Sequence, residues 1–347
     1  MGTNVEPNQS HTGKFKIMDE SRGLQRVVFA LTSLGNDFYS TMTRVAVASL
    51  RITNPPVRVM VVCDRQTNDA MRQDCDPLIS EVDEWITFDA PSGPSAYRNR
   101  FVKTRLRSLI DGPFLFLDSD ILVRGDLREI FLLDCDIAGA RNHSQVDFRK
   151  QVSDYDLTVI DRMGWEIGAN FYFNGGVLFW NDTTTARKLG EVWHCKWLDS
   201  STRLSGYRDQ AALNAAINDI SPKAFLLGTQ YNAQFQGNPS VTKGALLWHF
   251  YSDMPKNKEL KPSTTFELLV DDIIKTGKFD MALVLDMIRQ DHPWRISSFL
   301  DAYFVSKMIQ RGSAKKHEDY WLRRETLASI VRDFNNLHKK FLKDSVD

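Results

Sequence analysis

The chain is poor in cysteine, has no long hydrophobic run and carries no excess of charge of either sign. Its four cysteines are scattered and lack the paired spacing of a zinc site or a disulfide framework, which favours reduced thiols in a cytoplasmic protein. No apolar run approaches the roughly 20 residues that a membrane-spanning helix needs. The 44 basic residues balance the 44 acidic ones, so we expect no nucleic-acid partner.

What remains is the composition of a soluble globular protein, with 42% hydrophobic residues in a chain of 347. The first residues are polar and lack the apolar core of a secretory signal, so we expect residues 1–24 to form a disordered leader. From there to residue 117, β-rich runs alternate with amphipathic stretches, which predicts an α/β fold with a mostly parallel sheet flanked by helices. The expected strands cover residues 26–32, 57–63, 82–88 and 113–117, and the expected helices 37–51, 70–79 and 96–110.

The pattern changes in the second half of the chain. Residues 141–169 are polar and aromatic, which predicts a long loop, and long loops in compact domains are often functional. Apolar residues then flank an Asn-Gly-Gly triplet within residues 171–180. The remaining expected elements are helices over 183–198 and 208–219, short strands over 224–227 and 245–251, and mostly helix from residue 264 onward.

The acidic triplet Asp118-Ser119-Asp120 directly follows the wholly apolar strand PFLFL. A strand that is apolar on both faces is typical of a buried parallel sheet, and ligands bind beyond the carboxyl ends of such strands. Two carboxylates at this spacing point the same way and suit Mg²⁺ or Mn²⁺, which proteins usually share with substrate phosphates. The alternative is that the pair caps a helix or faces solvent.

Two further features have both a functional and a structural interpretation. Lys103, in the helix before the acidic triplet, can reach a nucleotide phosphate, or it can lie on a solvated helix face among neighbouring arginines. Asn174-Gly175-Gly176 lets a ligand approach the backbone closely and offers an amide to sugar hydroxyls, or it marks a β-bulge.

The same holds for two features nearer the C-terminus. Asp209-Gln210 opens a helix, where an aspartate ordinarily caps, but a carboxylate beside an amide also suits a pyranose ring. His249 lies among Leu247, Trp248 and Phe250. It is either a core histidine with satisfied hydrogen bonds or a third ligand for the metal.

In this order, the segments FLFLDSDILV, YFNGGVLFWN, RDQAALNAAI and LLWHF resemble glycosyltransferase family 8, which includes glycogenin-like and bacterial galactosyltransferase-like enzymes. The resemblance covers about residues 26–251. It implies a GT-A, Rossmann-like catalytic domain over residues 25–258, followed by a helical C-terminal region over 259–347. It also implies transfer of a hexose from a UDP-sugar donor, with retention of configuration and with Mn²⁺ (or Mg²⁺) as cofactor.

The resemblance implies a role for each motif residue. Asp118 and Asp120 bind the metal with His249, Asn174 and Asp209 hold sugar hydroxyls, and Gln210 lies near the anomeric carbon. The other implied donor contacts are Ala30, Leu31, Thr32 and Tyr39, for the nucleoside, and Lys103, Ser119, Gly175 and Lys256. After His249 the chain departs from the family, because it reads HFYSDMPKNKEL where the family has a glycine and then a lysine near Pro-Trp.

Retention requires either a covalent intermediate or attack from the leaving-group side. Because the amide of Gln210 is a poor nucleophile, we favour same-side attack, with the departing phosphate oxygen deprotonating the acceptor. The alternatives are a non-catalytic sugar-nucleotide or glycan-binding relative and a metal-dependent nucleotidyltransferase. The acceptor is a glycan, a lipid-linked sugar or a small molecule, and the oligomeric state is not readable. Residues 303–343 hold ten basic and four acidic residues, so this region either lies on an anionic membrane or packs on the catalytic domain.

Overall fold

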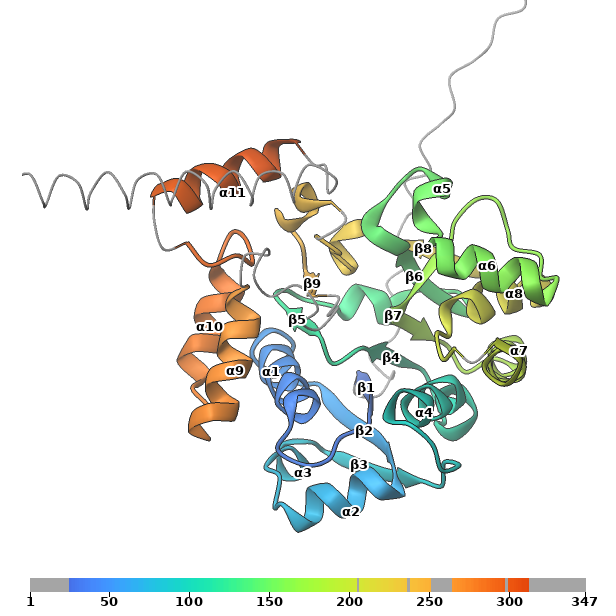
Figure 1. Ribbon diagram of the computed structural model, residues 1–347, viewed down its shortest axis with the longest axis horizontal. Helices are drawn as coiled ribbons and strands as arrows, with labels where there is room; N and C mark the ends of the chain where they lie inside the picture. The colour runs from blue at the N-terminus through green and yellow to red at the C-terminus, as the bar shows by residue number, and fades with distance from the viewer. Residues whose placement is uncertain (1–24, 205, 236–237, 251–263, 297–298, 312–347) are drawn as a thin grey trace, which may run out of the picture.

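The computed structural model describes residues 25–204, 206–235, 238–250, 264–296 and 299–311 (Figure 1). Its centre is a seven-stranded sheet in the order β3-β2-β1-β4-β7-β6-β8. Every neighbouring pair is parallel except those made by β7, which runs antiparallel to β4 and β6, so the predicted mostly parallel sheet is confirmed. The strands are β1 (Arg26–Leu31), β2 (Arg58–Asp64), β3 (Glu84–Phe88), β4 (Phe114–Leu117), β6 (Ile137–Arg141), β7 (Phe173–Trp180) and β8 (Ala224–Leu227).

Helices cover both faces of this sheet, as the apolar strands require (Figure 1). In β4, Leu115 and Leu117 pack in the core layer that contains α1, whereas Phe114 and Phe116 pack in the layer formed by α4, α7 and α8. The helices are α1 (Phe38–Thr53), α2 (Arg65–Gln73), α3 (Leu78–Glu81), α4 (Ser95–Leu109), α5 (Phe148–Gln151), α6 (Asp154–Met163), α7 (Thr184–Leu204) and α8 (Gln210–Ile220).

Two expected elements were wrong. The helix predicted over residues 70–79 is two helices, α2 and α3, because the Asp64 carboxylate caps α2 at the backbone N–H of Thr67 and Cys75 adopts a positive φ of 52° before Pro77. The loop predicted over residues 141–169 contains α5 and α6. Both of these helices begin at a side-chain cap, from Asp147 and Ser153 respectively, which periodicity alone does not reveal.

A second layer lies on the far side of α1. It contains the small sheet of β5 (Ile121–Val123) and β9 (Leu247–His249) and the helices α9 (Thr265–Thr276) and α10 (Met281–Arg289), followed by α11 (Phe299–Arg311). Met42 and Val45 of α1 pack against this layer, while Val47 and Leu50 face the main sheet. The expected helical region after residue 264 is therefore found as far as residue 311, and α9 and α10 pack on α1 and the small sheet. Later residues lie outside the described part.

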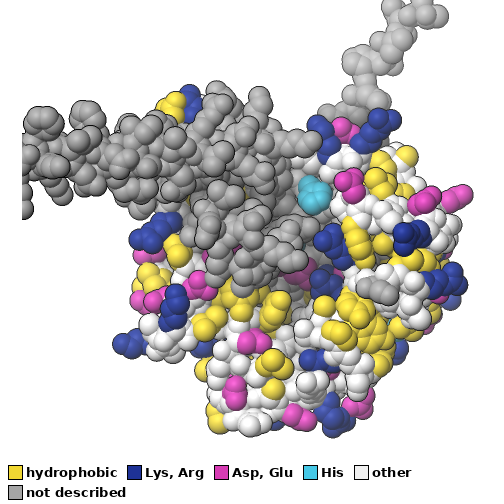
Figure 2. Space-filling view, viewed as in Figure 1, with side chains coloured by type: hydrophobic (Ala, Val, Ile, Leu, Met, Phe, Trp, Pro, Cys, Tyr) yellow, Lys and Arg dark blue, Asp and Glu magenta, His cyan; other side chains and the backbone are white. Residues whose placement is uncertain are grey.

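On the face shown in Figure 2, basic and acidic side chains of the described residues are interspersed, and neither sign gathers into one large patch. No helix among the described residues has both the length and the hydrophobicity needed to cross a membrane.

Arg124 joins the C-terminal helices to the small sheet. Its guanidinium lies 3.8 Å above the Trp248 ring and donates hydrogen bonds to the carbonyl oxygens of Ala245, Ile288 and Gln290. We expect Arg124→Met to lower the free energy of unfolding by about 2–4 kcal/mol, because it leaves partly buried carbonyls without donors. Urea denaturation measures the change. Arg65→Met is the matched control, since its ion pair with Asp89 is exposed and its loss should leave the free energy of unfolding nearly unchanged.

Candidate functional site

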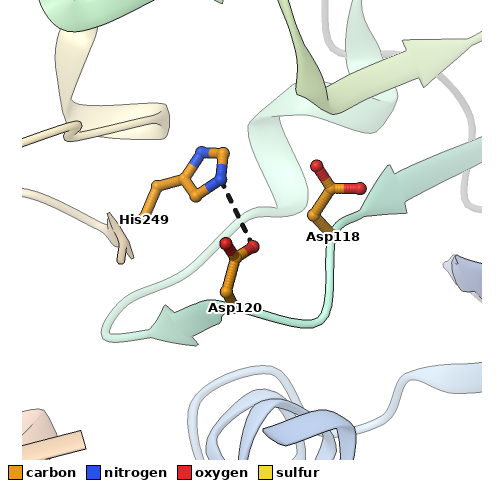
Figure 3. A group of neighbouring side chains, drawn as sticks. All are labelled: Asp118, Asp120 and His249. Carbon is orange, nitrogen blue, oxygen red and sulfur yellow. Dashed lines mark ion pairs between the residues drawn. The ribbon is translucent and has the colours of Figure 1, made fainter. Parts of the chain in front are cut away.

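Asp118, Asp120 and His249 converge beyond the carboxyl end of β4 (Figure 3). Asp118 follows β4 and Asp120 immediately precedes β5. The antiparallel pairing of β5 with β9 sets Ile121 opposite His249, and Phe250 N–H donates to the Asp120 carbonyl at 2.8 Å. This ladder brings the imidazole to the aspartates, with His249 Nε2 lying 3.3 Å from Asp120 Oδ1.

These three residues fit a divalent cation. One ligand atom from each lies within 4.8 Å of the others, and two carboxylates with an imidazole suit Mn²⁺ or Mg²⁺. Burial disfavours a charged imidazole, yet the neighbouring Asp120 and Asp118 outweigh it and hold the pKa of His249 above its usual value. The site therefore attracts positive charge, which a metal ion supplies in place of the proton.

Lys103 does not lie on a solvated helix face. Its side chain is 3% exposed, and its Nζ lies 3.1 Å from Asp118 Oδ1 and 3.5 Å from Asp209 Oδ2. Arg100, one helical turn earlier, places Nε 2.9 Å from Asp209 Oδ1. Burial alone would raise the pKa of Asp209, but Lys103 and Arg100 outweigh it, so the pKa is lowered and the carboxylate stays ionised.

Asp209 occupies the N-cap position of α8, but its side chain makes no capping hydrogen bond. Its oxygens are directed instead to Arg100 and Lys103. The capping interpretation of Asp209 is therefore not what the structure shows.

The Asn174-Gly175-Gly176 segment lies in β7, where the register between β6 and β7 shifts. This irregular pairing leaves backbone donors available to side chains. Gly175 N–H donates to Gln210 Oε1 at 3.1 Å, and Gly176 N–H donates to Asn174 Oδ1 at 2.9 Å. Both predicted interpretations therefore apply, because the same segment forms a bulge and lines the cavity.

One cavity of about 490 Å³ unites most of the predicted site residues. Leu31 is an exception, because its side chain is buried in the core between the sheet and α1. Lys256 lies outside the described residues. The predicted residues that line the cavity are Ala30, Thr32, Tyr39, Lys103, Asp118, Ser119, Asp120, Asn174, Gly175, Asp209, Gln210 and His249.

The sequence predictions missed other polar residues of this cavity. Arg100 lies one turn before Lys103, so their shared helix face was a usable signal. His143, Ser153 and Asp156 come from the segment that was predicted as a loop, and no local pattern marks them. Other residues that line the cavity are Asn99, Asn142, Tyr207 and Arg208.

The chain resembles several solved glycosyltransferase structures at low identity. GlyE of Streptococcus pneumoniae is 21% identical, with 76% of this chain and 62% of that chain covered and a TM-score of 0.47. LgtC in complex with donor and acceptor sugar analogues is 16% identical, with coverages of 66% and 88% and a TM-score of 0.45. The bifunctional WbbM is 14% identical with a TM-score of 0.45, and the match spans 68% of this chain but only 47% of WbbM.

No curated protein matches the chain significantly. The family model described as glycosyl transferase family 8, however, matches residues 30–262, which is most of the chain and includes every motif residue discussed above. The predicted family is therefore confirmed, and the chain belongs to glycosyl transferase family 8.

Proposed function

We propose that this glycosyltransferase is metal-dependent, takes a hexose from a UDP-sugar and transfers it to an acceptor hydroxyl with retention of configuration. The observation that carries the proposal is the convergence of Asp118, Asp120 and His249 in one cavity with the buried cation of Lys103. This arrangement joins a set of metal ligands to a fixed positive charge, which is what a departing diphosphate requires.

The residues of the cavity would bind two different parts of the donor, the diphosphate and the sugar. Asp118, Asp120 and His249 would hold Mn²⁺ or Mg²⁺, which when bound neutralises the negative charge that develops on the leaving diphosphate. Asp209 is held ionised by Lys103 and Arg100, so it can accept hydrogen bonds from sugar hydroxyls. Asn174 also lines the cavity, but its amide already makes hydrogen bonds at both ends, so it would bind a sugar hydroxyl only by exchanging one of them.

Gln210 supports same-side attack. Its Oε1 already accepts hydrogen bonds from Gly175 N–H and from Asn174 Nδ2, both at 3.1 Å, which makes a poor nucleophile poorer still. We therefore propose that the acceptor oxygen bonds to the anomeric carbon as the bond to the diphosphate breaks. The acceptor proton passes to the departing phosphate oxygen.

The acceptor would enter beside His143, Ser153 and Asp156, which line the cavity from the segment over residues 141–169. These polar groups suit a polyhydroxylated acceptor, whether a glycan, a lipid-linked sugar or a small molecule. We propose a cytoplasmic location, consistent with the free thiols of the buried Cys63 and Cys135.

A donor screen tests this function. We expect UDP-hexose with Mn²⁺ to raise the melting temperature, because a ligand at a hundredfold excess over its Kd adds about 2.7 kcal/mol of stability. Slow Mn²⁺-dependent hydrolysis of the same donor, abolished by EDTA, should accompany the shift. NMR of the product formed with an acceptor panel then reports the anomeric configuration.

Three other results would contradict the proposal. Binding without any cleavage indicates a sugar-nucleotide-binding protein, and transfer of the nucleotidyl group indicates a nucleotidyltransferase. Inverted product excludes retention.

A further inference from the structure

We infer that Asn232 is a positioning residue that fixes the proton arrangement of His249, so that His249 Nε2 presents its lone pair to the metal site. The inference rests on the proposed metal dependence. Asn232 belongs to none of the sequence motifs, yet it is completely buried, and His249 Nδ1 and Asn232 Oδ1 are 2.7 Å apart.

Two backbone N–H groups, which can only donate, fix the orientation of the side-chain amides around His249. Gly176 N–H is a donor and lies 2.9 Å from the side chain of Asn174, so the atom facing it is the acceptor, Asn174 Oδ1. Gly175 N–H fixes Gln210 in the same way at 3.1 Å. Asn174 Nδ2 then donates to Gln210 Oε1 and to Asn142 Oδ1, both at 3.1 Å. The contacts at the nitrogen and at the oxygen of Asn174 therefore require the same orientation of its amide.

The fixed orientation of Asn174 determines that of Asn232. Asn174 Oδ1 is an acceptor, so the atom of Asn232 that lies 2.9 Å from it is the donor, Nδ2. The amide oxygen of Asn232 must then face His249. Since an amide oxygen only accepts, His249 Nδ1 carries a proton and donates it, so Nε2 is the ring nitrogen that faces Asp120, where a metal ion can take the place of a second proton.

Burial keeps this arrangement from relaxing. Asn232, Asn174 and His249 are 0%, 5% and 3% exposed. If the amide of Asn232 flipped, its oxygen would face the oxygen of Asn174 and its NH₂ group would face the protonated His249 Nδ1, with no water to provide other hydrogen bonds. The backbone also holds Asn232 in register with the histidine. Ala233 N–H donates to the Leu247 carbonyl at 3.0 Å, and His249 N–H donates to the Ala233 carbonyl at 3.1 Å.

The bulged glycine segment therefore determines which imidazole nitrogen is available to a metal, through two side-chain amides. Metal-binding histidines depend on such outer hydrogen bonds, and losing one typically costs about 10–100-fold in metal affinity. We expect Asn232→Leu, which keeps the volume but removes both hydrogen bonds, to weaken Mn²⁺ binding by about this factor.

Isothermal titration of the full chain with MnCl₂ provides a readout independent of turnover. Asn54→Leu is the matched control, because Asn54 is also buried and bonds the Gly125 carbonyl at 3.0 Å and Leu127 N–H at 2.7 Å, outside the cavity. It should lose stability and keep the wild-type Kd for Mn²⁺. Asn232→Asp still accepts from Nδ1 and loses only the hydrogen bond to Asn174, so it should bind Mn²⁺ more tightly than Asn232→Leu does.

The turnover of Asn232→Leu should recover as the Mn²⁺ concentration is raised, which a loss of fold would not allow. If folded Asn232→Leu binds Mn²⁺ as tightly as the wild type, the inference is wrong. If the wild type itself binds no Mn²⁺, it is the proposed function that fails. The two failures are therefore distinguishable.

Discussion

Asp120→Asn is expected to lower the turnover number of the transferase by about a thousandfold, which corresponds to about 4 kcal/mol in the activation barrier. The substitution keeps the shape of the side chain but removes one of two anionic ligands. It also brings an amide group to within reach of His249 Nε2, which lies 3.3 Å from the present carboxylate. Both changes lower the affinity of the site for a cation, so the negative charge that develops on the leaving group is less well neutralised.

Steady-state kinetics with saturating donor and Mn²⁺ measures this effect, and titration with MnCl₂ shows whether metal affinity falls with it. Asp219→Asn is the matched control, because it removes the same charge from an exposed aspartate that pairs with Lys196 outside the cavity. Near-normal turnover of Asp120→Asn under Mn²⁺ would show that the metal role is wrong.

Gly176→Ala should strongly weaken metal binding while leaving the fold intact. A methyl group at this position would lie 2.5 Å from His249 Cε1, 2.7 Å from Asp118 Oδ2 and 3.1 Å from Asn174 Oδ1. The histidine and the asparagine are buried and packed, so the aspartate or the imidazole must leave its place. We expect the Kd for Mn²⁺ to rise by at least about a hundredfold, in line with the disruption of ligand orientation.

Gly175→Ala separates this steric effect from a general loss of glycine. Its added methyl group would meet Lys103 Nζ at 3.6 Å and Asp209 Oδ2 at 3.7 Å, which is ordinary van der Waals contact. Mn²⁺ affinity should therefore survive in Gly175→Ala, while circular dichroism should show both variants folded. Equal Mn²⁺ affinity in the two variants would mean that Gly176 does not border the metal site.

The parts of the site that are determined by residues adjacent in the sequence could be predicted from the sequence. The apolar run before Asp118 fixes a buried strand, and a buried strand of a parallel sheet places its following residues at the ligand edge. The family motifs supplied His249, which enters the site only through the pairing of β5 with β9. The residues around His249 do not indicate this pairing, because β5 lies more than a hundred residues earlier in the chain.

The missed features depend on tertiary contacts. Arg100 shares a helix face with Lys103, but its partner Asp209 lies at the start of a different helix, and no local pattern indicates that contact. Asn232 lies in a segment with no recognisable pattern, and its importance follows from hydrogen bonds to Asn174 and His249, which lie 58 and 17 residues away in the chain. Leu31 was predicted to contact the nucleoside, but the alternation along β1 sends its side chain into the core.

The pairing of β9 with β5 has a consequence for how the protein matures during synthesis. The two aspartates leave the ribosome before the histidine, which is carried by β9, the last strand among the described residues. Trp248 and Phe250, on either side of that histidine, are covered by residues of α9 and α10, such as Phe266 and Val284. A nascent chain would thus hold only two of the three proposed metal ligands in place until these helices have emerged, and we expect the ability to bind Mn²⁺ to arise only then.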